Sequence, residues 1–269
     1  MGLADAVRQA AARGADFVGV AGGDGTIRGG AEPLLEGLVP LLAVPAGTRN
    51  HFAHQLGVTD LAAAAQAVQG RVEAVDVGEV NGRCFINNSA IGLYSDLVAR
   101  REAYQARGIP KRMAQALADI AELVRGHRFT IGLDGTTYRV WLVFVGNGHY
   151  GNDLFDLAAR DTLNQHVLDV RILRGDQPLA RVRLLGAALF GRLERSALVV
   201  RHLCSEVRIE VDSSDVKIAL DGELVTTTSP LLYRSRPGAL KVLIPLPQHR
   251  AASKPHVLRH SPRTHRPAK

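Results

Sequence analysis

The chain has 269 residues, of which 46% are hydrophobic and 22% charged, a composition typical of a globular protein with room for two modest domains. Its two cysteines, Cys84 and Cys204, exclude a disulfide framework and predict a reducing compartment. No run approaches the roughly 18 apolar residues of a membrane span, and no signal-peptide pattern is visible, so we expect a cytoplasmic protein.

Helix and strand patterns alternate over roughly the first 70 residues. We expect helices at 3–13, 27–37, 49–56 and 60–69, and strands at 16–21 and 41–44. Such alternation predicts an α/β domain with a parallel sheet, which we assign to residues 1–73.

The first of these strands ends in a glycine-rich turn, Gly22-Gly23-Asp24-Gly25-Thr26. Glycines permit positive φ and let backbone N–H groups approach an anion closely. The following helix would point its positive end at the same place. Asp24 would repel a phosphate unless Mg²⁺ lay between them. An ordinary turn without a ligand is the alternative, and we favour phosphate binding.

The second strand ends in a comparable turn, Pro45-Ala46-Gly47-Thr48-Arg49-Asn50. Both turns are expected at the carboxyl ends of parallel strands, where open α/β sheets bind ligands. Gly47, Thr48 and Asn50 would then offer a backbone donor, a hydroxyl and an amide to one nucleotide. Taken alone, this turn is equally compatible with a simple helix cap.

From about residue 74 short strand patterns dominate. We expect helices only at 114–125 and 179–191, and strands at 75–80, 83–87, 129–133, 137–145, 168–173, 197–201, 206–211, 217–220 and 239–244. Asn81-Gly82 and Asp134-Gly135 are typical of type I′ hairpin turns, and by spacing alone Asp221-Gly222-Glu223 is a further turn. We interpret residues 74–247 as a β-sandwich or distorted barrel, whose last strand either stays in it or returns to the first domain.

Positive charge is concentrated in the last segment, residues 248–269, which holds six Lys/Arg and no acidic residue. The formal net charge of the whole chain is +7, so the rest is close to neutral. We expect this tail to be disordered and attracted to anionic lipid. An inert tail and a contact with nucleic acid are the alternatives. Because the charge belongs to the tail, no nucleic-acid-binding fold is expected.

The GGDGT turn, the Pro-x-Gly-Thr-x-Asn turn and the late Asp-Gly-Glu together resemble the diacylglycerol kinase catalytic-domain family. This family includes bacterial lipid kinases and sphingosine kinases, and it is distantly related to NAD kinases and 6-phosphofructokinases. The resemblance covers roughly residues 15–246, including 75–94 at the entry to the second domain. It implies an α/β N-terminal domain followed by a β-rich sandwich-like domain.

For the chemistry, the resemblance implies ATP on the two turns, with Mg²⁺ near Asp24. It implies that Glu223 is the general base on a lipid hydroxyl, that of diacylglycerol or a similar alcohol. A lipid substrate further implies a protein that visits the inner membrane face peripherally.

Three departures from the family pattern are evident. Its first strand and Asn-Pro-type loop are missing before GGDGT, which would leave an exposed sheet edge and predicts weak activity and a homodimer. Arg28 follows GGDGT where the family usually has Asn. The segment of this chain that matches the family's structural Mg²⁺ loop, residues 163–170, reads Leu-Asn-Gln-His-Val-Leu-Asp-Val. Backbone carbonyls of Leu168 and Val170 remain candidate ligands, although a hard divalent ion prefers a carboxylate.

The function we predict is ATP-dependent phosphorylation of a lipid hydroxyl. A non-catalytic or degraded lipid- or nucleotide-binding member of the family is the first alternative, because of the missing strand and the altered metal loop. A second is an NAD kinase, which shares GGDGT but is disfavoured by the Pro-x-Gly-Thr-x-Asn turn and the late Asp-Gly-Glu. A third is a fragment of a longer kinase.

Overall fold

The computed structural model describes residues 1–92, 128–133, 135–151, 160, 162–177, 179–180 and 198–246. Its helices are α1 (Leu3–Ala12), α2 (Asp24–Ala31), the 3₁₀ turn η1 (Glu32–Leu34), α3 (His51–Gln55) and α4 (Leu61–Val68). Its strands are β1 (Val18–Gly22), β2 (Leu41–Pro45), β3 (Arg71–Val80), β4 (Arg83–Phe85), β5 (Asn88–Gly92), β6 (Phe129–Leu133), β7 (Thr136–Asn147), β8 (Leu168–Arg174), β9 (Val199–Cys204), β10 (Glu206–Val211), β11 (Asp215–Leu220), β12 (Glu223–Thr228) and β13 (Leu231–Ile244). Within these ranges, none of the helices has the length and apolar character that a membrane crossing needs.

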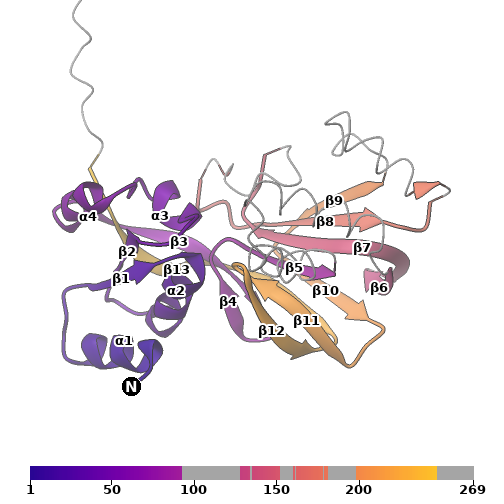
Figure 1. Ribbon diagram of the computed structural model, residues 1–269, viewed down its shortest axis with the longest axis horizontal. Helices are drawn as coiled ribbons and strands as arrows, with labels where there is room; N and C mark the ends of the chain where they lie inside the picture. Colours follow the sequence, from indigo (N-terminus) through magenta and orange to yellow (C-terminus); the bar gives the residue numbers. More distant parts are fainter. Residues whose placement is uncertain are drawn as a thin grey trace, which may run out of the picture.

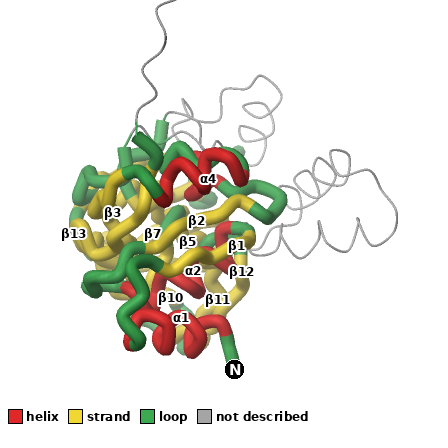
Figure 2. The backbone as a smooth tube through the Cα atoms, turned by 90° about the vertical axis from the view of Figure 1, so that its left-hand side faces the viewer, coloured by secondary structure: helices red, strands yellow, loops and turns green. Residues whose placement is uncertain are grey.

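The N-terminal part places helices on both faces of a small sheet, as Figures 1 and 2 show. Strands β1 and β2 run parallel, with Gly22 opposite Pro45 at their carboxyl ends. Helices α1 and α2 lie on one face and α3 and α4 on the other. Their aliphatic side chains form one core with the strands, in which Ile27, Leu41 and Phe52 are fully buried. The predicted α/β domain with a parallel sheet is confirmed.

The second part is built from antiparallel strands. The long strand β7 has β8 on one side, and on the other side β6 and then β5. In Figure 1, β7 to β9 lie over β10 to β12. A second aliphatic core packs among these strands, with Ile131, Val143 and Ile209 fully buried. This arrangement confirms the predicted β-rich, sandwich-like region.

Two long strands, β3 and β13, run through both parts of the molecule. They pair antiparallel from Tyr233–Val80 to Ile244–Arg71, with a bulge between Arg236 and Leu240. The start of β13 pairs with β10, and near its end Val242 pairs in parallel with Leu41 of β2. Both hydrophobic cores receive side chains from these two strands. Continuous backbone therefore fixes the loops of the first part relative to the turns of the second.

Several elements differ from the prediction. Helix α2 begins at Asp24, inside the glycine-rich turn, and ends at Ala31 instead of spanning 27–37. Strands β5 and β12 and the first half of β13 were not predicted. The expected helix at 114–125 lies outside the described residues, as do residues 181–191 of the other one and the tail at 248–269. The Asn81-Gly82 hairpin is confirmed, with φ of 46° and 79° between β3 and β4.

Candidate active site

The two predicted phosphate turns lie side by side. Because Gly22 faces Pro45 across the parallel pair, the turns that follow both start at the carboxyl ends of the strands. The N–H of Ala46 donates to the carbonyl of Gly22 at 3.2 Å. A Cβ on Gly47 would lie 2.3 Å from the Cα of Gly23. The turns are therefore in direct backbone contact, as expected for two halves of one site.

Close approach, and not positive φ, is what these glycines provide. None of the glycines in the two turns has φ in the left-handed region. A Cβ on Gly22 would lie 2.5 Å from the Cβ of Thr26, and one on Gly25 would lie 2.3 Å from Oε1 of Glu223. The positive φ that these glycines would permit is not used, because helix α2 already begins at Asp24.

Asp24 joins the two turns through its carboxylate. Its Oδ1 accepts a hydrogen bond from the N–H of Phe52 at 3.0 Å, and its Oδ2 accepts one from the N–H of His51 at 3.2 Å. Those two amides are the first of helix α3. Asp24 therefore satisfies two N–H groups that a helix start otherwise leaves without acceptors.

The second turn is closed by Asn50. This residue has φ of 52°, and its side chain binds the backbone N–H and C=O of Gly47 at 2.8 and 2.9 Å. Thr48, like Thr26 in the first turn, has an exposed side chain. The hydroxyls are therefore accessible to a ligand, while the Asn50 amide holds the shape of its own loop.

The Asp-Gly-Glu segment is the hairpin turn between β11 and β12. Asp221 and Gly222 have φ of 49° and 89°, as a type I′ turn requires. The carboxylate of Asp221 accepts N–H bonds from Ile86, Asn87 and Asn88 at 2.7 to 3.1 Å. Burial raises the pKa of Asp221 to about 6, against these three donors and the charge of Arg28. Asp221 thus anchors the Asp221-Gly222 turn, which is followed directly by Glu223.

The segment held by Asp221 is also held from its other side. Arg160 donates to the carbonyls of Ile86 and Asn147 at 3.0 and 2.6 Å, and to the side chain of Gln55 on α3 at 3.1 Å. This guanidinium is almost fully buried. The base of the Asp-Gly-Glu turn is therefore fixed to both parts of the molecule.

Glu223 lies against the first phosphate turn. Its Oε1 touches Gly25, as the close approach of the added Cβ shows, and its Oε2 accepts a hydrogen bond from Nη2 of Arg28 at 2.7 Å. The side chain of Arg28 is 11% exposed and that of Glu223 is 52% exposed. The structure therefore brings Asp24, Gly25 and Glu223 together, although they come from distant parts of the chain.

Sequence reasoning gave no role to Arg28 or to Asp221. The spacing of Arg28 from Asp24 is the one signal available, because residues four apart share a helix face. Burial disfavours the charged guanidinium of Arg28, but the bond to Glu223 and the charges of Asp221 and Glu223 outweigh it and raise its pKa above the ordinary value.

The loop predicted to hold a structural Mg²⁺ does not suit a divalent cation. Leu168 and Val170 are fully buried in β8, which pairs with both β7 and β9, so the backbone is engaged in the sheet. Between them, Asp169 binds the guanidinium groups of Arg171 and Arg201 at 2.8 and 2.6 Å. Among the residues that the structure describes, no group of three or more His, Cys, Asp or Glu could hold a metal ion.

Asp169 is neutralised by these two arginines. Burial opposes its ionisation, but the hydrogen bonds from Arg171 and Arg201 outweigh burial and lower the pKa of the carboxyl below its ordinary value. Arg171 also donates to the carbonyls of Tyr150 and Gly151. Two side-chain cations thus neutralise the carboxylate that lies between the two candidate carbonyls in the sequence.

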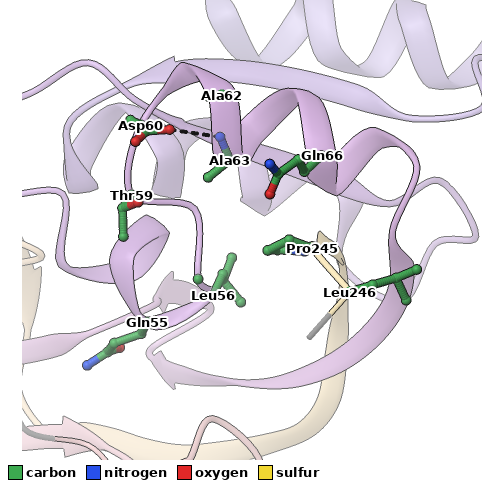
Figure 3. Close-up of a pocket in the computed structure, with 10 residues that line it drawn as sticks. Gln55, Leu56, Thr59, Asp60, Ala62, Ala63, Gln66, Pro245 and Leu246 are labelled. Atoms are coloured by element: carbon green, nitrogen blue, oxygen red, sulfur yellow. Dashed lines mark hydrogen bonds between the residues drawn. The ribbon is translucent and has the colours of Figure 1, made fainter. Parts of the chain in front are cut away.

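Two hollows lie beside α3. The larger, about 520 Å³, opens between the α3–α4 connection and Pro245–Leu246, as Figure 3 shows. The smaller, about 290 Å³, is bordered by Gln55, Arg160 and Leu163 among others. Neither is lined by the two phosphate turns or by Glu223, so the candidate site is defined by the contact between those turns and not by these hollows.

Both parts of the chain match family models of known proteins. Residues 2–80 match the family model described as diacylglycerol kinase catalytic domain. Residues 91–244 match the model described as YegS C-terminal NAD kinase beta sandwich-like domain. The boundary between the two matches falls close to the end of β3.

Similar proteins carry the corresponding names. A Pseudomonas fluorescens protein named "Probable lipid kinase YegS-like" is 32% identical over 245 residues, which cover 89% of this chain and 81% of that protein. A Bacillus subtilis protein named "Diacylglycerol kinase" is 28% identical over 240 residues, 81% of this chain and 74% of that protein. The crystal structure of a diacylglycerol kinase from Bacillus anthracis has the same fold, with a TM-score of 0.59 at 20% identity over 90% of this chain and 80% of that one. The chain therefore belongs to the diacylglycerol kinase catalytic-domain family.

Proposed function

We propose that this protein transfers the γ-phosphoryl group of ATP to the hydroxyl of a lipid, diacylglycerol or a similar alcohol. The observation that carries the proposal is the contact of Glu223 with Gly25. A carboxylate capable of accepting a proton thereby lies beside a glycine-rich turn suited to phosphate. The names of the similar proteins support a lipid as the acceptor.

The two turns form the donor site in this proposal. Gly23 and Gly47 leave a surface free of side chains, and the first turn continues directly into α2, whose N-terminal N–H groups favour a negatively charged ligand. Thr26 and Thr48 add exposed hydroxyl groups. Asp24 would hold Mg²⁺ with its free lone pairs, and the ion would neutralise phosphate charge.

Glu223 acts as the general base. The lipid oxygen forms the new bond to the γ-phosphorus, the bond to the bridging oxygen breaks, and ADP leaves. The hydroxyl proton passes to the Glu223 carboxylate. Most of the acceleration in such transfers comes from positioning and charge neutralisation, so the rigid attachment of Glu223 through Asp221 matters as much as its basicity.

The acceptor brings the protein to a membrane surface in this proposal. Diacylglycerol resides in the bilayer, so the protein would act peripherally, at the cytoplasmic face of the inner membrane. Anionic lipid would attract the basic segment 248–269.

The test is transfer of ³²P from [γ-³²P]ATP to a mixed lipid extract, with NAD offered in a parallel reaction. We expect a labelled phospholipid that requires Mg²⁺ and diacylglycerol, and no labelled NADP. Labelled NADP without labelled lipid would identify an NAD kinase instead. Absence of transfer to either acceptor, with ATP still bound, would favour a non-catalytic member of the family.

A further inference from the structure

Arg28 is a buried cation whose contacts converge on the proposed base. It lies on α2 one helical turn after Asp24, and Ile27, Gly30 and Ala31 of the same helix are also buried. The one side-chain hydrogen bond of Arg28 that the structure records goes to Glu223, 195 residues away in the chain. A residue in the first helix after the phosphate turn thus contacts the late Asp-Gly-Glu turn directly.

Hydrogen bonds satisfy this arginine only in part. Within the described part of the chain, its Nε is buried without a hydrogen-bond partner. Leaving such a donor unsatisfied costs roughly 1–3 kcal/mol. The bond to Glu223 and the charges of Asp221 and Glu223 outweigh the burial of the guanidinium charge. Glu223 is half exposed and could be solvated without Arg28, so the pair orients one particular carboxylate.

The two oxygens of Glu223 are used differently. Oε2 accepts the hydrogen bond from Arg28 at 2.7 Å, whereas Oε1 lies beside the Cα of Gly25. One oxygen is therefore anchored, and the other faces the phosphate turn. A carboxylate bound at one oxygen loses rotational freedom, which is the condition for a general base to meet its proton in a fixed geometry.

We propose that Arg28 is a positioning residue, which holds Glu223 so that Oε1 receives the proton of the lipid hydroxyl beside Gly25. This inference rests on the proposed phosphoryl transfer and deepens it, because it assigns the reacting oxygen and the group that orients it. Asp221 anchors the turn through the backbone of 86–88, and Arg28 anchors the side chain.

The test compares Arg28→Met, Arg28→Lys, Glu223→Gln and the double variant Arg28→Met/Glu223→Gln in the lipid transfer assay. Arg28→Met should lower kcat by about 10²-fold, the usual effect of misplacing a catalytic group by an ångström. The KM for ATP should change by less than about twofold, since Arg28 acts on the base and not on the donor. Arg28→Lys keeps a charged donor and should recover about a tenth or more of the wild-type kcat.

The double variant separates positioning from a merely structural role. If Arg28 acts through Glu223, adding Arg28→Met to Glu223→Gln should lower kcat by no more than about twofold. Arg8→Met on α1, which removes an exposed arginine that pairs with Asp5, serves as the matched control and should leave kcat unchanged. Thermal unfolding of every variant checks the fold, and Arg28→Gln replaces Arg28→Met if the latter does not fold.

Three results would overturn the inference. Multiplicative losses of kcat in the double variant would make Arg28 and Glu223 independent. A raised KM for ATP at constant kcat in Arg28→Met would place Arg28 in donor binding. A wild-type protein that transfers no phosphate would overturn the proposed function together with this inference, whereas an active wild type with an equally active Arg28→Met would overturn the inference alone.

Discussion

At the scale of single residues, Asp24 has one structural role and one proposed catalytic role. Its carboxylate accepts the N–H groups of His51 and Phe52, which ties the first phosphate turn to the start of α3. Our proposal also gives it Mg²⁺. The two roles use different lone pairs of the same oxygens, so one substitution can separate them.

Asp24→Asn should lower phosphoryl transfer by at least about 10²-fold at matched Mg²⁺, because loss of a metal-held charge costs several kcal/mol of transition-state stabilisation. The free energy of unfolding should fall by only about 1 kcal/mol, since the amide still accepts one of the two N–H bonds. Asp60→Asn is the control, because the Asp60 carboxylate accepts an N–H bond at the start of α4, outside the site. Full activity of Asp24→Asn across a Mg²⁺ titration would make Asp24 a cap and nothing more.

At the scale of elements, β8 carries a buried ion cluster of Asp169, Arg171 and Arg201. Asp169 is fully buried, and its lowered pKa means that the folded protein releases this proton more readily than the unfolded chain. The ionised cluster therefore stabilises the fold above the unfolded-state pKa of about 4. This contribution is lost as the pH falls through the folded-state pKa of Asp169.

Arg201→Met should lower the free energy of unfolding by about 3 kcal/mol at pH 7, because it leaves a buried carboxylate with one cation fewer. The difference from wild type should shrink as the pH falls below the unfolded-state value of about 4 and through the lowered folded-state pKa of Asp169. Arg174→Met, which breaks the more exposed pair with Asp176, should cost less than about 1 kcal/mol. Urea unfolding between pH 3 and pH 7 measures both; a pH-independent difference for Arg201→Met would contradict this account of Asp169.

Strand β1 lies at the end of the strand order of the sheet. Among the described strands it pairs only with β2. The N–H of Val18 donates to the carbonyl of Pro40 on that side, so the N–H of Gly19 points to the open edge. An apolar strand with an open edge favours pairing with another chain.

We therefore expect concentration-dependent dimers in light scattering, and Gly19→Lys should reduce them by placing a charge on this edge. A Cβ at Gly19 has no atom within 4 Å, so the lysine should be accommodated. Leu61→Lys on the exposed face of α4 adds the same charge elsewhere and should leave the dimer unchanged. A wild-type protein that stays monomeric at every concentration would contradict this expectation.

What the sequence could predict follows from how local each signal is. The Asn81-Gly82 turn depends on neighbouring residues, and it is observed. Strand β5 was not predicted because its polar and small residues carry no alternating pattern. Its residues pair with β7 and β11. The contact between Arg28 and Glu223 was not predicted because it joins two segments that are distant in the sequence. The family resemblance, not local pattern, singled out Glu223.

At the scale of the whole molecule, positive charge is concentrated at one end of the sequence. Residues 1–247 are nearly neutral, and the excess positive charge lies in residues 248–269. Each Lys or Arg near an anionic surface contributes about 1 kcal/mol of attraction, which salt screens.

Removing residues 248–269 should reduce co-sedimentation with phosphatidylglycerol-containing vesicles at low salt. Turnover of lipid dispersed in neutral detergent should not change, because the tail contributes no residue to the proposed site. Vesicles of phosphatidylcholine alone are the control and should bind both forms equally weakly. Equal binding of the two forms to anionic vesicles at all salt concentrations would assign the membrane contact to the folded part.

The central claim is that Glu223 and the glycine-rich turn form one phosphoryl-transfer site. Glu223→Gln keeps the shape of the side chain and removes its basicity, so the most direct measurement compares its kcat and its ATP affinity with those of wild type. Glu210→Gln, an exposed change on β10, serves as the control. The account predicts a fall in kcat of roughly 10²–10⁴-fold with the Kd for ATP nearly unchanged. Full turnover by Glu223→Gln, or a parallel loss of turnover and ATP affinity, would contradict it.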